Sequence, residues 1–177
     1  MATSISAKRI KFKARGYDDF INNVLPKLDK ICDKTINDPT GHLQIAIMEA
    51  ANNVARYSTT NLEQAEININ ITVHMCDISV HISGDTKEWD VERYVTEIKR
   101  LAYSPDCVDK NFGEFKGDRL SGRGIWLMLE ACEYLYIDSK TKAITMAVSY
   151  PFNPKIITQK MTILADRLHV LQNGVIK

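Results

Sequence analysis

Hydrophobic residues recur along the chain with two periods, and each period predicts one kind of secondary structure. A period of two residues, apolar alternating with polar, is typical of a strand with one buried face. This pattern predicts strands at residues 8–14, 67–73, 78–82, 134–138 and 143–150. Short segments at residues 75–77 and 139–142 separate the later strands and predict two hairpins.

A period of about 3.6 residues, typical of amphipathic helices, fills most of the remaining chain. It predicts helices at residues 17–33, 41–57, 88–103, 125–132 and 155–170. Pro26 lies inside the first of these, where it is expected to kink the helix. Residues 104–122 show neither period. They form a long loop, and loops of this length tend to be functional lids or disordered segments.

The order of these elements predicts an α+β fold. Helices would cover one face of a mainly antiparallel sheet, which gives a two-layer α/β sandwich. The chain of 177 residues suffices for one core of ordinary size and is short for two. We therefore expect one domain at residues 1–153, with residues 154–177 as a C-terminal helical extension of the same domain.

The composition limits the partners and the compartment. Lys and Arg total 23 against 22 Asp and Glu, and this net charge of +1 argues against a nucleic-acid or membrane surface driven by overall charge. The four cysteines form no C-x-x-C pair, so we expect buried, reduced thiols at Cys32, Cys76, Cys107 and Cys132. No apolar run approaches about 18 residues, and residues 1–12 lack the core of a signal peptide, which predicts a soluble cytoplasmic protein.

The helix at residues 41–57 carries a pair of polar side chains that could hold a metal ion and a water. Glu49 and Asn53 lie one turn apart on the rim of its apolar stripe, where a cleft is expected. Alone, such a pair is more often an ordinary hydrogen-bonded feature than a site. Ile45 and Met48 lie on the opposite side, and their positions predict a helix sandwiched between the sheet and other helices.

A second candidate lies at the start of the helix at residues 125–132. Gly122 and Gly124 flank Arg123 there, and the free N–H groups and positive dipole of a helix start can hold phosphate. Glycine lets a phosphate approach the backbone closely. Alone, a glycine-rich segment before a helix is more often a tight turn.

In this order along the chain, the two features resemble the Bergerat-fold (GHKL) ATPases, the family of gyrase, histidine kinases and mismatch-repair ATPases. The resemblance covers roughly residues 8–150 and is closest to the small bacterial anti-sigma factors that are serine/threonine protein kinases. The segment from Glu49 to Asn53 resembles the family's E-x-x-x-N box, and residues 121–128 resemble its later glycine box. The loop from Ser104 would be the ATP lid.

This resemblance implies roles for the candidate residues. Asn53 would coordinate Mg²⁺ that bridges the phosphates of ATP, and Glu49 would be the general base that accepts the hydroxyl proton of a serine or threonine on a partner protein. Gly122, Arg123 and Gly124 would cradle the phosphates. The partner would be a sigma factor-like protein or an anti-sigma antagonist, in a partner-switching regulator, and homodimers are common in this branch.

The family's middle box, D-x-G-x-G, is degenerate in this chain. Its aspartate recognises adenine, but Gly84 stands at that position, and Thr86 and Glu88 stand at the glycine positions. Asp85 is displaced by one residue, and a bulge at Gly84 would return it to the cofactor site. The alternative function is a non-catalytic Bergerat-fold module that binds a protein and no longer binds ATP. A third interpretation is an unrelated α+β domain.

Overall fold

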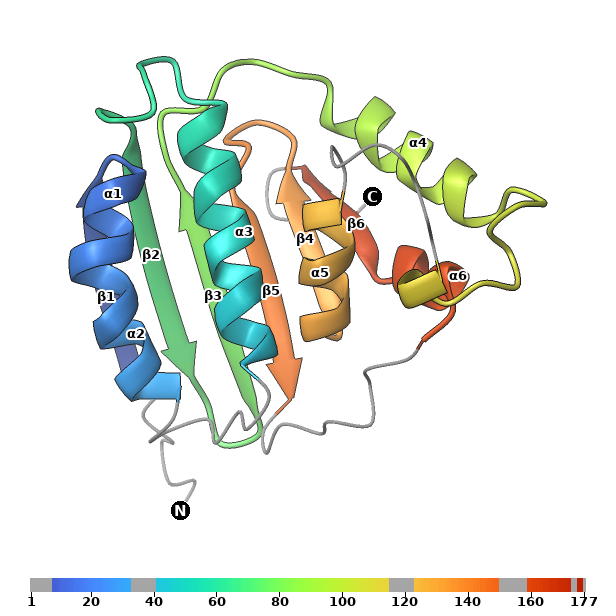
Figure 1. The fold of residues 1–177 in the computed structure, drawn as a ribbon, viewed down its shortest axis with the longest axis horizontal. Coiled ribbons are helices and arrows are strands. Elements are labelled where there is room, and N and C mark those ends of the chain that lie inside the picture. The colour runs from blue at the N-terminus through green and yellow to red at the C-terminus, as the bar shows by residue number, and fades with distance from the viewer. Residues whose placement is uncertain (1–7, 33–40, 115–122, 150–158, 173–174, 177) are drawn as a thin grey trace.

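The computed structural model describes residues 8–32, 41–114, 123–149, 159–172 and 175–176. The fold is α+β, with helices packed on one face of a seven-stranded, mainly antiparallel sheet (Figure 1). This confirms the two-layer α/β sandwich predicted from the order of the elements.

The sheet is open and has the strand order β1-β2-β3-β5-β4-β6-β7. Its strands are β1 (Lys8–Arg15), β2 (Glu66–Val73), β3 (Asp77–Ser83), β4 (Tyr134–Asp138), β5 (Ile144–Ser149), β6 (Leu168–Gln172) and β7 (Val175–Ile176). Neighbouring strands are antiparallel except β4 and β6, which are parallel. All the strands predicted by alternation are therefore confirmed, and both predicted hairpins form.

The helical layer also follows the predicted pattern as far as residue 131. Its elements are α1 (Tyr17–Asp19), the π-helical η1 (Phe20–Val24), α2 (Leu25–Ile31), α3 (His42–Arg56), α4 (Val91–Ala102), the 3-10 turn η3 (Phe112–Glu114), α5 (Arg123–Ala131) and α6 (Met161–Asp166). The elements α1, η1 and α2 follow one another without a break and together form the first predicted helix.

Pro26 changes the winding of that first helix. A proline lacks the N–H that would bond the fourth residue before it, and its ring crowds that residue's carbonyl. Directly before it, the chain widens into a π-helical turn in which the N–H of Leu25 bonds the carbonyl of Phe20. The expected distortion thus takes the form of a widened turn.

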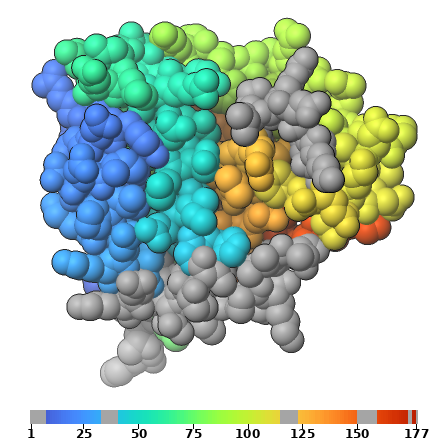
Figure 2. Space-filling model, in the orientation of Figure 1, coloured from blue at the N-terminus to red at the C-terminus, as the bar shows by residue number. Residues whose placement is uncertain are grey.

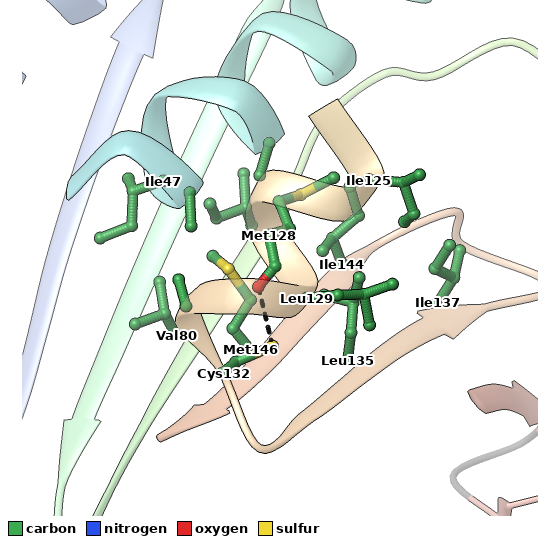
Figure 3. Close-up of a cluster of buried hydrophobic side chains, with 14 of the residues drawn as sticks. Ile47, Val80, Ile125, Met128, Leu129, Cys132, Leu135, Ile137, Ile144 and Met146 are labelled. Atoms are coloured by element: carbon green, nitrogen blue, oxygen red, sulfur yellow. Dashed lines mark hydrogen bonds between the residues drawn. The ribbon is translucent and has the colours of Figure 1, made fainter. Parts of the chain in front are cut away.

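The hydrophobic core fills the space between the sheet and the helices. In β2, Ile67, Ile69 and Ile71 are buried, while the residues between them face the other side of the sheet. Figure 3 shows Met128 and Leu129 of α5 above Leu135 and Met146 of the strands beneath. This packing holds α5 against the sheet, and the first turn of α5 is part of the site described below.

The cysteines follow the prediction with one exception. All four are free thiols, and Cys32, Cys107 and Cys132 are buried. The Cys132 thiol donates a hydrogen bond of 3.0 Å to the carbonyl of Met128, and burial raises its pKa to about 12. Cys76 is exposed, contrary to expectation, because it lies in the turn between β2 and β3, outside the helical layer.

The prediction that α3 is sandwiched between the sheet and other helices is wrong for its outer side. Ile45 is 43% exposed, although Met48 packs against the core. The helix has neighbours at its sides, with the elements α1 and α2 on one side and α5 on the other (Figure 1). A two-layer fold has no third layer to cover its outer side.

The predicted helix at residues 155–170 is wrong in its second half. Of the described residues, only Met161–Asp166 are helical, and Leu168–Gln172 form β6, parallel to β4. Leu168 and Val170 fit a period of two as well as a helical period, and pairing with the free edge of β4 selects the strand. The C-terminal segment is therefore part of the sheet. Residues 155–158 lie outside the described residues.

Asp90 is expected to stabilise the start of α4. Its side chain accepts a hydrogen bond of 2.9 Å from the N–H of Arg93, as in a standard N-cap. Asp90→Ala should lower the free energy of unfolding by about 1 kcal/mol in urea titrations. Asp106→Ala, in the loop after α4, is the control and should have little effect; equal losses would contradict the capping role.

Candidate functional site

The candidate site lies where α3 and α5 pack side by side. Figure 2 shows both helices at the surface of the helical layer, α3 in cyan and α5 in orange. A Cβ atom added to Gly124 would lie 2.7 Å from Oε2 of Glu49 and 3.7 Å from Nδ2 of Asn53. The structure therefore brings these three candidates together, and a residue without a side chain allows the close approach.

The start of α5 contributes positive electrostatic potential to this cluster. The first N–H groups of a helix have no partner within the helix, and its dipole places partial positive charge there. Glu49 and Asn53 thus lie beside a helix start that favours anions. The charge of Glu49 is itself favourable at this position. Residues 115–122 of the predicted lid, which include Gly122, lie outside the described residues.

Tyr17 lies on the other side of Glu49, on α1. Burial, and then the negative charge of Glu49, raise the pKa of its phenol. Glu49 and Asn53 are half-buried, and neither side chain forms a hydrogen bond or ion pair with another described residue. Within the described structure, the oxygens of both side chains are therefore available to bind a ligand. Sequence patterns gave no sign of Tyr17, because its approach to Glu49 depends on how α1 and α3 pack.

Arg123 begins α5, but its side chain points toward the loop before the helix. The guanidinium carbon lies 5.9 Å from the centre of the Phe112 ring, and that ring stacks on Trp126 at 6.2 Å. This is the geometry of a cation–π contact. Arg123 is exposed and anchored to η3, at the edge of the cluster formed by Glu49, Asn53 and Gly124.

Asp85 has a different set of partners from those expected of an adenine-binding residue. Its Oδ2 accepts hydrogen bonds from the hydroxyls of Ser58 at 2.8 Å, Thr59 at 3.0 Å and Thr60 at 3.1 Å. Its Oδ1 accepts one from the N–H of Glu66 at 3.0 Å. Asp85 thus joins the loop after α3 to the start of β2, and protein donors use both of its oxygens.

The surroundings of Gly84 leave no room for a side chain at the middle-box position. A Cβ there would lie 2.1 Å from the carbonyl oxygen of Glu66 and 2.5 Å from Cγ1 of Val54. β3 ends at Ser83, so Gly84 and Asp85 lie beyond the strand. Nearby, Oγ1 of Thr86 is buried and has no hydrogen-bond partner among the described residues. A bound molecule or water would satisfy that oxygen.

The hydrogen bonds of Asp85 should make stability depend on pH. Partial burial alone would raise the pKa of this carboxyl, but bonds from Ser58, Thr59 and Glu66 outweigh burial and lower the pKa to about 2. Because the folded pKa lies below the unfolded one, the stabilisation is present above about pH 4 and is lost as the pH falls toward 2.

Unfolding titrations at several pH values test this dependence. Wild type should lose more stability between pH 4 and pH 2 than Asp85→Asn, which cannot ionise. Asp106→Asn, in an exposed loop, should keep the wild-type profile. An unchanged profile in Asp85→Asn would show that the hydroxyl contacts do not stabilise the ionised carboxylate.

The residues present fit a magnesium ion held together with phosphate groups. Magnesium takes oxygen ligands and commonly keeps several waters, with one or two protein ligands and substrate phosphates completing its shell. The amide oxygen of Asn53 is such a ligand. Among the described residues, no three His, Cys, Asp or Glu side chains gather as a metal site, so the ligand set would depend on the phosphates.

No protein-family model matches the chain, and no curated protein matches it. Within the described residues, no helix has the length and apolar character needed to cross a membrane. The fold and the site define the class of protein. It is an α+β two-layer sandwich in which a carboxylate, a carboxamide and a helix start lie in one cluster.

Proposed function

We propose that this protein is an ATP- and Mg²⁺-dependent serine/threonine protein kinase that acts as a partner-switching regulator, similar to bacterial anti-sigma factors. The observation that carries the proposal is that Glu49 and Asn53 of α3 lie beside Gly124, in the first turn of α5. A base, a metal ligand and a phosphate-binding helix start are the groups that phosphoryl transfer requires in one place.

Each group has a separate role in this reaction. The N–H groups at the start of α5 would hold phosphate oxygens, and Asn53 would supply an oxygen to the metal ion. Bound Mg²⁺ would neutralise charge on the phosphates. Glu49 accepts the proton of the serine or threonine hydroxyl as its oxygen bonds to the γ-phosphorus. The bond from that phosphorus to the bridging oxygen breaks, and ADP leaves with the electron pair.

The substrate of this reaction would be a protein in the cytoplasm. We propose a sigma factor-like protein or an anti-sigma antagonist as the partner, and a homodimer as the assembly. The net charge of +1 favours a protein over a nucleic acid or a membrane. Light scattering tests the assembly, because a monomeric mass at working concentration would reject the homodimer.

Two observations favour a second candidate function, a non-catalytic protein-binding module. The middle-box position holds Gly84, whose surroundings leave no room for a side chain. The neighbouring Asp85 already accepts hydrogen bonds at both oxygens. A Bergerat-type pocket without its adenine acceptor would lose about 1–3 kcal/mol of binding if nothing replaced that contact.

Calorimetric titration separates the two functions. Under the kinase proposal, ATP and ADP bind, and Mg²⁺ strengthens the binding. Asn53→Ala should remove the effect of Mg²⁺, whereas Asn52→Ala, one residue away on the same helix, should retain it. No heat at millimolar nucleotide would reject the kinase and favour the binding module. Equal affinity with and without Mg²⁺ in wild type would reject the role of Asn53.

A further inference from the structure

β1 offers an unpaired edge for a further strand. It stands at one end of the strand order, and in the described part of the chain it pairs only with β2. The pairing runs without interruption over all 8 residues, an edge of about 27 Å. Every second residue of such an edge turns its N–H and C=O groups away from the neighbouring strand.

Basic side chains occupy one face of this edge. The residues on the face without helices are Arg9, Lys11, Lys13 and Arg15, which stand opposite Thr72, Asn70, Asn68 and Glu66 of β2. Among the described residues, only Lys13 of these four forms an ion pair, at 2.8 Å to Glu66. The face therefore carries more positive charge than its neighbours neutralise.

Apolar side chains occupy the other face. Ile10 and Phe12 point toward the helical layer and pack against the core, but they are only partly buried because no strand lies beyond them. A strand added at this edge would cover both side chains. The edge thus combines free backbone groups, positive charge on one face and half-covered apolar surface on the other.

The charges disfavour a second copy of β1 as the added strand. In an antiparallel pair of two identical strands, basic residues on the same face would lie opposite or diagonal to one another, and like charges there are destabilising. Acidic residues at the same positions would instead form favourable cross-strand pairs. Charge complementarity therefore selects an acidic partner over a second copy.

We propose that β1 binds, by strand addition, an extended segment of a partner protein in which acidic and apolar residues alternate. The acidic residues face Arg9, Lys11 and Lys13, and the apolar residues cover Ile10 and Phe12. The backbone of the segment bonds the free groups of β1, the mode of recognition in which main-chain bonds provide affinity and alternate side chains provide specificity. The inference does not depend on nucleotide binding.

The same residues have a competing explanation as protection against aggregation, since lysines on an edge strand discourage pairing with other chains.

A labelled peptide of 8 residues, matched to β1, in which glutamate alternates with valine, distinguishes the two explanations. Fluorescence anisotropy with the full chain should show saturable binding that weakens as salt is added. Two control peptides should not bind. In one, lysine replaces glutamate, which reverses the charge; in the other, the glutamate peptide is methylated at alternate backbone nitrogens, which removes the main-chain donors.

Charge-reversal variants locate the binding. The double variant Arg9→Glu and Lys11→Glu should lower the affinity for the glutamate peptide at least about tenfold. Lys27→Glu with Lys30→Glu, on α2, changes the net charge equally and should leave affinity within about twofold, with circular dichroism confirming that both variants fold. Hydrogen exchange should show new protection of β1 amides when the peptide is bound.

Several outcomes would overturn the proposal. Absence of saturable binding by the glutamate peptide would support edge protection alone. Equal weakening in the α2 control, or full binding by the methylated peptide, would mean that general charge attraction acts instead of strand pairing. Tighter binding of an oligothymidylate than of the peptide would assign the face to a nucleic acid. Protection of β1 amides that rises with protein concentration in the absence of peptide would assign the edge to a second copy.

Discussion

Glu49→Gln is expected to lower the rate of phosphoryl transfer by about 10²–10⁴-fold. Glutamine keeps the shape of the side chain beside Gly124 but cannot accept the hydroxyl proton. Nucleotide affinity should equal or exceed that of wild type, because the change removes a negative charge near the phosphates. Asn53 and the start of α5 remain in place in this variant.

Single-turnover formation of ADP from ATP measures this effect without a known protein substrate, since water can take the place of the hydroxyl. Glu130→Gln is the matched control, because Glu130 is a half-buried carboxyl further along α5, with a pKa raised by burial. It should keep the wild-type rate. A Glu49→Gln protein that transfers phosphate at the wild-type rate would remove Glu49 as the base.

Gly84→Asp, which places an aspartate at the middle-box position, should destabilise the fold by about 3 kcal/mol or more. Its Cβ would lie 2.1 Å from the carbonyl oxygen of Glu66, a backbone atom at the start of β2. That backbone cannot move freely, because β2 pairs with β1 on one side and β3 on the other. The same Cβ would also lie 2.5 Å from Cγ1 of Val54 on α3.

Urea unfolding measures the loss, with Gly113→Asp as the control. Gly113 lies in η3, and a Cβ there meets no atom within 4 Å, so its replacement should change stability by about 0.5 kcal/mol or less. A Gly84→Asp protein as stable as wild type, with stronger binding of ATP, would show that the position can be an adenine site after all. The crowding around Gly84 would then be readily relieved.

The strands and central helices could be predicted because each buries one face against a single core. The alternation of Ile67, Ile69 and Ile71 matches a sheet covered on one side, and the apolar stripe of α3 matches a helix on that sheet. β6 could not be predicted, because its few apolar residues fit both periods. The choice depends on the edge of β4, which the local sequence does not describe.

The site was predictable only in part, for a similar reason. The spacing of Glu49 and Asn53 places them on one helix face, but their position beside Gly124 depends on α3 and α5 being neighbours on the sheet. The resemblance to Bergerat-fold ATPases supplied that expectation. The hydrogen bonds of Asp85 depend on how the loop after β3 meets the loop after α3 and the start of β2, and residue spacing holds no information about them.

The parallel pairing of β6 with β4 has a consequence for biosynthesis. Until residues 168–172 have left the ribosome, β4 is an edge strand. During that time Leu135 of β4 lacks its partner Leu168 of β6. Exposed strand edges and apolar surface make nascent chains prone to aggregate, and pairings between distant segments form slowly. The synthesis of β6 therefore determines when the edge of β4 becomes covered in the newly made protein.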